Sequence, residues 1–524
     1  MKKQVLYILA TIVPILAMGQ ITEVANINPA GDSNPAEFYV DSSNRLFFSA
    51  DNGTDGKELY VYNGSATTLI DINNSAVGLN STPARFIEFN GKIYFKANDE
   101  ATKAELWETD GTVANTKMVA DINPGTGNGN PDHFFIFNNE LYFTPLDGSS
   151  TQIWALNGGT PIKITANNGG GFSSASYPYV ASTGVFMRIN NGNGNELGFF
   201  TGSGNVIEVL DIRPGSSTGF LAATDGKNMK LLGNKFFFEA DSTGPDDELW
   251  VSDGTTIGTF QVANTNPSGA GDPDDLEVFQ GEMYFASKGA NGYQLWKSNG
   301  TVMGTVLVSD IYPGGDAQVS NLFANGSTLY FAATNGTNGT NGIELWKYDG
   351  TSSTLVKDIN TAGDATPSDF VALGGMVYFV ANDGTGLKLW MTNGTNAGTV
   401  QVASQFGSSE NPTNVSNLKV RDGKLIFSGT GTNGNELFTF DPATLSTENV
   451  IAERLKVFPN PAPNYIMVSK SLLNAPYSIH EITGKTIKQG IITSEKLNLS
   501  LSSGLYLLKV KTDLSTLTKK IIIK

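Results

Sequence analysis

The chain contains no cysteine, and its 524 residues include only two histidines, His133 and His480. The lack of cysteine excludes disulfides, a thiol nucleophile, Cys-ligated zinc and iron–sulfur clusters, and two histidines exclude a multi-histidine metal centre. Charged residues are scarce at 16%, whereas 40% of residues are hydrophobic, so we expect a folded chain with a large core. Glycine is abundant at 59 residues, which together with many Asn, Asp, Ser and Thr indicates turn-rich β structure.

The chain has fewer basic than acidic residues, with 34 Lys and Arg, 50 Asp and Glu and a formal net charge of −16. Binding to nucleic acid needs a basic surface, so no nucleic-acid partner is expected. The imbalance is not uniform, since residues 453–524 hold 11 Lys/Arg against 4 Asp/Glu. This change of sign predicts a domain boundary near Glu453.

Long apolar runs are confined to the N-terminus. Two lysines are followed by the apolar stretch Val5–Met18, and the small residue Gly19 precedes Gln20. This pattern predicts a signal peptide over residues 1–19, cut between Gly19 and Gln20. A membrane anchor is the alternative, but the run is shorter than the ~20 residues that a span requires. We therefore expect an exported chain with no membrane-spanning segment after signal removal.

The rest of the sequence is dominated by an internal repeat of about 47 residues. Its anchor is Glu-Leu-Trp or a close variant, and all six tryptophans of the chain occupy the third anchor position. The central residues of the nine anchors are Leu59, Leu106, Ile153, Leu197, Leu249, Leu295, Leu345, Leu389 and Leu437.

Each unit has the composition of a four-stranded antiparallel sheet. Short β-branched and aromatic segments are separated by Asn-Gly or Asp-Gly pairs, which supply the positive φ angles of tight hairpin turns. A period near 47 residues lies between two known blade lengths, so we predict an all-β fold with a β-propeller over residues 20–452. The repeated tryptophans are expected between neighbouring blades, where a large aromatic side chain buries most surface. A parallel β-helix is the less favoured alternative.

Nine anchors predict nine blades, although the fourth unit, around residues 169–204, lacks its tryptophan. If that unit is only a partial blade, the ring has eight. The segment Glu23–Pro29 resembles the last strand of a unit but precedes the first complete one. We predict that it completes the last blade, whose own first three strands end near Phe440, and so closes the ring.

The anchors and the turns after them resemble the ELWxxDGT repeats of secreted bacterial proteins. The best matches are Glu105–Thr112 and Glu248–Thr255, and the second continues into Gly258-Thr259 as the fuller motif does. The resemblance covers roughly residues 20–450. It implies a blade-like repeat and no established chemistry.

Residues 453–524 read as a small β-sandwich of short strands between Gly, Pro and Ser. They resemble the type A C-terminal sorting domain of the type IX secretion system of Bacteroidetes. The residues that carry the resemblance are Pro459, Asn460, Pro461, Gly484, Lys485, Gly504 and Tyr506. It implies the type IX machinery as a partner, passage across the outer membrane, removal of the domain, and a released or surface-attached product. His480 lies inside this domain and is interpreted as structural.

No residues assemble into a recognisable catalytic motif. A Ser-His-Asp triad would have to use His133, which is better interpreted as a hydrogen-bonded residue near a loop. Recurrent acids such as Asp110 and Asp253 are expected to stabilise turns, because a catalytic pair should be unique to one unit. No cofactor is expected, although Asp51 and Asp55 in one polar loop are weak candidates for binding Ca²⁺.

Two functional hypotheses remain for the secreted or surface-attached product. The first is a non-enzymatic binding or adhesion protein whose loops grip a glycan or protein ligand. The alternative is a secreted polysaccharide-active enzyme, a lyase or glycosidase, with its site in the deviant fourth unit near Tyr177, Tyr179 and Arg188. The sequence gives no reason for these three residues to converge, so an enzyme is the less favoured hypothesis.

Overall fold

The computed structural model describes residues 19–524, apart from 102, 126, 149, 165–171, 173, 191, 193, 203–205, 216, 222–225, 245, 337–341, 443–456, 469–471, 474, 482–484 and 512–515. Ile21–Phe440 form one compact unit, and the residues from Asp441 onward belong to a second. The predicted signal peptide and Gly484 lie outside the described residues.

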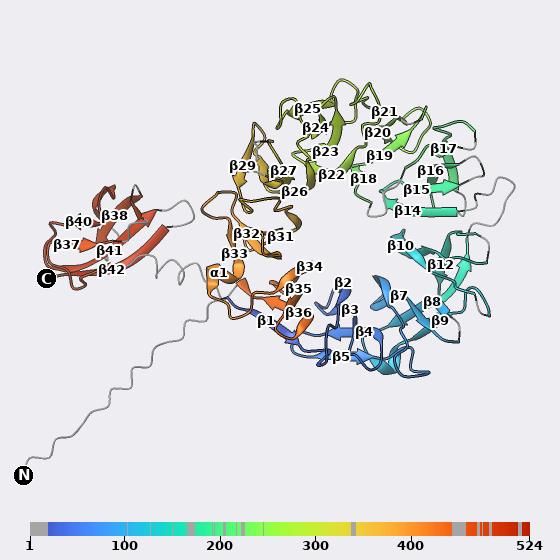
Figure 1. The fold of residues 1–524 in the computed structure, drawn as a ribbon, viewed down its shortest axis with the longest axis horizontal. Helices are drawn as coiled ribbons and strands as arrows, with labels where there is room; N and C mark the ends of the chain where they lie inside the picture. The colour runs from blue at the N-terminus through green and yellow to red at the C-terminus, as the bar shows by residue number, and fades with distance from the viewer. Residues whose placement is uncertain are drawn as a thin grey trace, which may run out of the picture. The chain divides into compact units, whose positions relative to one another are not determined.

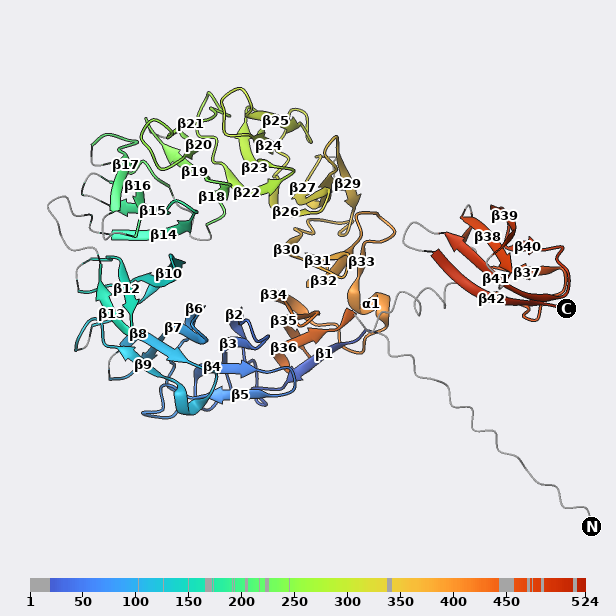
Figure 2. The same ribbon diagram turned by 180° about the vertical axis from the view of Figure 1, so that it is seen from behind.

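In the described part of the first unit, nine four-stranded antiparallel sheets follow one another around a ring, as Figures 1 and 2 show. The chain is therefore an all-β propeller of nine blades, and the eight-blade alternative is wrong. Blades one to three are β2 (Ala36–Val40), β3 (Leu46–Asp51), β4 (Lys57–Tyr62) and β5 (Thr67–Ile70); β6 (Ala84–Phe89), β7 (Lys92–Asp99), β8 (Lys103–Thr109) and β9 (Lys117–Ala120); and β10 (Asp132–Phe137), β11 (Glu140–Thr144), β12 (Trp154–Asn157) and β13 (Thr160–Lys163).

Blades four to six are β14 (Ser174–Val180), β15 (Val185–Asn190), β16 (Asn195–Phe200) and β17 (Val206–Leu210); β18 (Met229–Leu232), β19 (Lys235–Asp241), β20 (Asp247–Ser252) and β21 (Phe260–Gln261); and β22 (Asp274–Phe279), β23 (Glu282–Gly289), β24 (Gly292–Ser298) and β25 (Val306–Ser309). Blades seven and eight are β26 (Ser320–Asn325), β27 (Thr328–Ala333), β28 (Glu344–Tyr348) and β29 (Ser353–Lys357); and β30 (Ser368–Leu373), β31 (Met376–Asn382), β32 (Leu387–Thr392) and β33 (Val400–Gln401). A short helix, α1 (Val402–Phe406), follows β33.

The ring is closed by a strand from the start of the chain. Blade nine consists of β34 (Thr413–Arg421), β35 (Lys424–Gly431), β36 (Gly434–Phe440) and β1 (Ile21–Ala25). β1 is antiparallel to β36, with Ile21 opposite Phe440 and Ala25 opposite Leu437. The predicted closure is confirmed, because the first three strands of the last blade end where the first strand of the chain joins them.

Tight turns hold successive strands at the spacing that a blade requires. At Asn90-Gly91 the φ angles are 51° and 75°, and at Asp422-Gly423 they are 48° and 69°. Two successive positive φ values fit the right-handed twist of a two-residue hairpin, which explains the recurrent Asn-Gly and Asp-Gly pairs.

The core lies mainly between blades. Trp107 of blade two, 8% exposed, packs in one buried cluster with Phe47 and Leu59 of blade one. Trp250 packs on Phe186 of the preceding blade in the same way. The predicted interblade position of the tryptophans is confirmed.

Blade four retains four strands without a tryptophan. Its anchor has Gly198 at the third position, where an added Cβ would lie 2.7 Å from Ile189 and 3.0 Å from Val206. These two side chains take up the space beside the anchor, so the blade closes with a different packing.

The second unit contains a two-stranded and a four-stranded sheet among its described residues. The first is β37 (Tyr465–Met467) with β40 (Lys496–Asn498), and the second runs in the order β39 (Thr486–Ile491), β38 (Pro476–Glu481), β41 (Gly504–Lys511) and β42 (Thr516–Ile523). Asn460 accepts a hydrogen bond from Ile522 N (2.8 Å) and donates one to Lys520 O (3.0 Å), and Tyr506 is buried in the core.

Candidate functional site

The anchor glutamates are structural clamps. Glu105 in β8 is completely buried, and its carboxylate accepts hydrogen bonds from Ile122 N at 2.8 Å and Gly129 N at 2.6 Å. It thereby fixes the connection between the last strand of its own blade and the first strand of the next. The same contact with a backbone N–H a few residues past the end of the blade's last strand recurs at Glu58, Glu196, Glu248, Glu344 and Glu436.

Burial raises the pKa of these carboxyl groups, and backbone N–H donors oppose the rise. The pKa is about 7 for Glu105, Glu196 and Glu344, and about 6 for Glu248. A raised pKa often marks a catalytic acid, but the oxygens of these carboxyl groups already accept backbone hydrogen bonds inside the fold. The recurrent glutamates therefore offer no exposed acid for chemistry.

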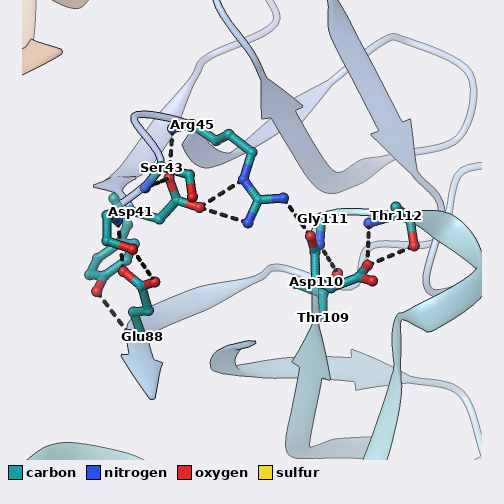
Figure 3. Close-up of polar contacts among 10 residues, drawn as sticks. Asp41, Ser43, Arg45, Glu88, Thr109, Asp110, Gly111 and Thr112 are labelled. Atoms are coloured by element: carbon teal, nitrogen blue, oxygen red, sulfur yellow. Dashed lines mark hydrogen bonds and ion pairs between the residues drawn. The ribbon is translucent and has the colours of Figure 1, made fainter. Parts of the chain in front are cut away.

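The Asp-Gly-Thr turns are also structural (Figure 3). Asp110 accepts hydrogen bonds from the backbone N (2.9 Å) and the Oγ1 (2.6 Å) of Thr112, and these bonds lower its pKa. Arg45 of the preceding blade is bound by Asp41 and donates to the carbonyl of Asp110. The interpretation of these acids as turn residues agrees with this geometry.

The loop of the calcium candidates is organised by its own side chains. Asp51 accepts a hydrogen bond from Gly53 N at 2.7 Å, and Asp55 accepts one from the Asn52 amide at 2.8 Å. Within the described residues, the acids that gather closely enough to hold a metal are instead Glu239, Asp247 and Asp272. Glu239 already binds Asn228 and Asp272 binds Lys288, so internal contacts occupy this group as well.

A different set of side chains lies along the innermost strands of the ring. The first strand of each blade lies nearest the ring axis (Figures 1 and 2), and in eight blades it is interrupted by a β-bulge. At the bulge one non-glycine residue has a φ between 49° and 61°; blade nine has a second, Asn414, at an additional register shift. These residues, called here the axial ring, are Glu37, Arg85, His133, Tyr177, Asp275, Asn321, Asp369 and Asn417.

The axial ring is linked from blade to blade. Asp275 accepts a hydrogen bond from the backbone N of Asn321 in the next blade at 2.6 Å, and Glu37 accepts one from Arg85 N at 3.5 Å. Lys227 lies 3.4 Å from Asp275 and 3.1 Å from the Asn321 side chain. A bulge re-aims its side chain, and left-handed backbone at a non-glycine residue costs energy that a useful geometry offsets.

A hollow of about 380 Å³ opens on this wall. Its lining comes from the first strands of five consecutive blades, β14 to β30, and from the residues just before β18, and it includes Lys227, Asp275, Asn321 and Asp369. Both signs of charge and an amide thus face one solvent-filled space. This arrangement can bind a polar molecule through several hydrogen bonds at once.

Beside β14, His133 of blade three meets Tyr177 and Arg188 of blade four. His133 and Tyr177 meet edge to face with ring centroids 5.0 Å apart, and the Arg188 guanidinium lies 4.8 Å from the centre of the Tyr177 ring. Tyr179 does not join them, because it packs on Phe236. The sequence showed no reason for the three fourth-unit residues to converge, and the structure brings Tyr177 and Arg188 together but not Tyr179.

The electrostatics of this cluster favour a neutral imidazole beside a cation. Burial lowers the pKa of His133, Asp132 opposes the shift, and the nearby Arg85 and Arg188 add to it. Burial also lowers the pKa of Arg188, whose Nε donates to Ser176 Oγ at 3.0 Å. The register position of Arg188 varies between blades: blade two has Lys96, blade five has Glu239, and blades six to eight have Ala286, Ala332 and Val380.

The sequence did contain a sign of the axial ring. A proline stands two residues before the ring residue in several units, as at Pro35, Pro83, Pro131, Pro273 and Pro367. Proline removes a donor and restricts its neighbour, which suits the irregular start of an innermost strand. The residue two positions after the proline differs in type from unit to unit. A constant proline followed by a variable residue therefore marks the position of the axial ring.

Residues 456–524 match the family of secretion system C-terminal sorting domains. The protein is therefore secreted through the type IX system to the extracellular or cell-surface space, and its C-terminal domain interacts with that machinery. Within the described residues, no helix is long and apolar enough to cross a bilayer. No curated protein sequence matches the chain.

Several solved structures are similar over most of the propeller. PorZ, an essential surface component of the type IX secretion system of Porphyromonas gingivalis, is 14% identical with a TM-score of 0.31, over 92% of this chain and 74% of its own. A puromycin-hydrolysing peptidase of Mycobacterium tuberculosis is 10% identical with a TM-score of 0.36, over 70% of this chain and 60% of its own. Virginiamycin B lyase of Staphylococcus aureus is 13% identical with a TM-score of 0.30, over 69% and 96%. At these TM-scores the likenesses carry no argument about function.

Proposed function

We propose that the mature chain is a non-enzymatic binding protein of the ELWxxDGT-repeat type, exported from a member of the Bacteroidetes after removal of its signal peptide. Its axial ring holds the ligand. The observation that carries this proposal is the repeated bulge, which gives eight blades the same backbone conformation with side chains of six different types. A constant frame with one variable displayed residue per unit is the arrangement of a recognition surface on a rigid scaffold.

The axial ring suits a glycan better than a folded protein. Seven of its eight members are charged, amide or imidazole side chains, and the eighth is Tyr177. The cores of protein–protein interfaces are depleted of charged residues, whereas sugar hydroxyls need many donors and acceptors in one place. Adhesion to an extracellular polysaccharide would follow from such binding at the cell surface. Ca²⁺ at Asp51 and Asp55 remains a secondary proposal within this function.

The test is a glycan array probed with the full mature chain, with and without Ca²⁺. His133→Asn and Tyr177→Asn are suitable variants, because Asn321 and Asn417 already occupy the equivalent backbone conformation. We expect both to weaken retention of the bound glycan, while the exposed Glu100→Ala, away from the ring, leaves it unchanged. Absence of glycan retention by the wild type, or equal retention by all variants, would overturn the proposal.

A polysaccharide-active enzyme is the second candidate, and the convergence of His133, Tyr177 and Arg188 favours it. In a β-elimination, a base removes the proton next to a uronate carboxylate, a C=C bond forms, the glycosidic C–O bond breaks, and the leaving oxygen takes up a proton from water. A neutral His133 can take the proton, and Arg188 can pair with the carboxylate. Unsaturated products from an acidic polysaccharide, lost in His133→Asn, would establish this function. Retention without products would leave the binding proposal standing.

A further inference from the structure

Arg421 is a buried cation with neither an ion-pair nor a hydrogen-bond partner among the described residues. It ends β34, is 7% exposed, and its Nε is fully buried with no hydrogen-bond acceptor. Among the described residues, no carboxylate forms an ion pair with it, and its guanidinium contacts the face of Tyr62 at 4.9 Å from the ring centre. Burying an uncompensated charge is strongly unfavourable, so a residue in this state calls for a counter-ion.

The repeat does not require a cation at this position. Arg421 pairs with Lys424 across the β34–β35 turn, and the residues at the same place in blades two, six and eight are Phe89, Phe279 and Leu373. An apolar side chain is therefore the ordinary solution. Arginine here is specific to the seam where blade nine meets blade one.

Arg45, between blades one and two, shows the partners that a structural arginine has at such a position. Its guanidinium is bound by Asp41 and donates to the Asp110 carbonyl of the following blade (Figure 3). Arg421 also approaches a turn of the following blade, since a Cβ on Gly64 would lie 2.8 Å from its Nη2. However, no carboxylate or carbonyl of that turn accepts a hydrogen bond from it.

The side chain borders a hollow of about 250 Å³. The hollow is lined by polar groups of both blades, including Asn63 and Ser65 from the β4–β5 turn and Lys424 from the β34–β35 turn. Two cationic side chains and the amide N–H groups of Asn63 around a space of this size match the needs of one anionic group, whereas the Ser65 hydroxyl already donates to Asn63 Oδ1 at 2.9 Å. Asp422 also lines the hollow and is exposed to solvent, where its charge is screened.

We propose that this seam pocket, defined by Arg421, Asn63, Ser65 and Lys424, binds an oxyanion, either a phosphate group or the carboxylate of an acidic sugar. The bound anion accepts hydrogen bonds from the Arg421 guanidinium and supplies its missing counter-charge. Because the pocket is shared between the last and the first blade, its ligand also stabilises the closed ring. The proposal is independent of the axial ring and of any glycan bound there.

The experiment measures binding and thermal unfolding of the full mature chain with inorganic phosphate, with glucuronate and with glucose, at constant ionic strength. We expect phosphate, glucuronate or both to bind saturably and to raise the unfolding midpoint, and glucose to do neither. A response to one anion alone identifies the source of the charged group. Absence of a response to both anions would refute the proposal.

Two matched variants separate binding from packing. Arg421→Met replaces the buried cation by an apolar side chain of similar length, so the midpoint should stay equal or rise, while anion affinity falls on the order of tenfold or more. Arg45→Met removes a paired arginine, so the midpoint should fall while the anion response persists. If Arg421→Met keeps the wild-type anion affinity, or if Arg45→Met loses it equally, Arg421 is not the binding group.

Discussion

The hydrogen-bond partners of an anchor residue predict how exchanging glutamate for glutamine there changes the stability of the propeller. Glu105 accepts hydrogen bonds from two backbone N–H groups, of Ile122 and Gly129. Gln294, the anchor of blade six, accepts from Ile311 N at 3.0 Å but donates its amide to the Gly315 carbonyl, also at 3.0 Å. The anchor is therefore glutamate where the second partner is a donor and glutamine where it is an acceptor.

Glu105→Gln should destabilise the propeller although it conserves shape. One amide oxygen can serve only one of the two donors well, and the amide nitrogen faces the other N–H. Leaving a buried donor unsatisfied costs about 1–3 kcal/mol, so we expect a loss in that range. At pH 6, below the pKa of about 7, most of the native carboxyl is neutral, so no buried charge is relieved by the substitution, and its hydroxyl oxygen keeps a lone pair that can accept from the second N–H, which an amide nitrogen lacks.

Urea unfolding at pH 6 measures the loss, and hydrogen exchange should show reduced protection of the Gly129 or Ile122 amide. The exposed Glu100→Gln serves as the control and should stay within ~0.5 kcal/mol of the wild type. The reciprocal Gln294→Glu should also be destabilising at pH 8 and recover at low pH, where the protonated carboxyl can donate to Gly315. If Glu105→Gln leaves both the free energy of unfolding and the amide protection unchanged, Glu105 does not hold the connection between blades two and three.

Three further outcomes are expected. The pKa is about 7 in the folded chain, against 4.5 for the free group, for Glu105, Glu196 and Glu344. The contribution of these groups to stability is therefore full below pH 4.5 and falls as the pH rises to about 7, by up to ~1.4 kcal/mol per pH unit for each titrating group. A urea midpoint that is not lower at pH 8 than at pH 5 would contradict this prediction. Trp107→Ala should cost about 3–5 kcal/mol in urea unfolding, and Trp107→Phe less, because the indole Nε1 has no acceptor among the described residues and its loss breaks no hydrogen bond. Deletion of Ile21–Ala25 should lower the thermal midpoint and promote association seen by light scattering, since β36 loses its neighbour; an unchanged monomer would show that closure is dispensable.

The fold was largely predictable because its determinants are local and repeated. Nine anchors predicted nine blades, the aligned tryptophans predicted interblade packing, and the orphan strand before the first unit predicted closure. Each of these rests on hydrophobic period or turn chemistry, which acts over a few residues. The missing tryptophan of the fourth unit suggested a partial blade, but the blade is complete because Ile189 and Val206 take up the space beside Gly198.

The candidate sites were much less predictable, because they depend on contacts between blades. Tyr177 and Arg188 lie on the paired strands β14 and β15, whereas His133 comes from β10 of the preceding blade, and only the packing of blade three against blade four brings it to them. Likewise, Arg421 meets Tyr62 across the closing seam. The proline before the axial ring was visible in the sequence, yet its meaning required the positive φ two residues later.

The closing strand has a consequence for how the molecule tolerates damage. Ile27 donates to Glu436, 409 residues away in the sequence, so the last blade holds both ends of the repeat array. An open array of repeats needs polar end units and can unravel from either end. A closed cycle has no end unit, and a single cut in a surface loop leaves a linear piece whose blades are still held at every seam. Exposure to extracellular proteases should therefore nick this propeller more readily than it dismantles it.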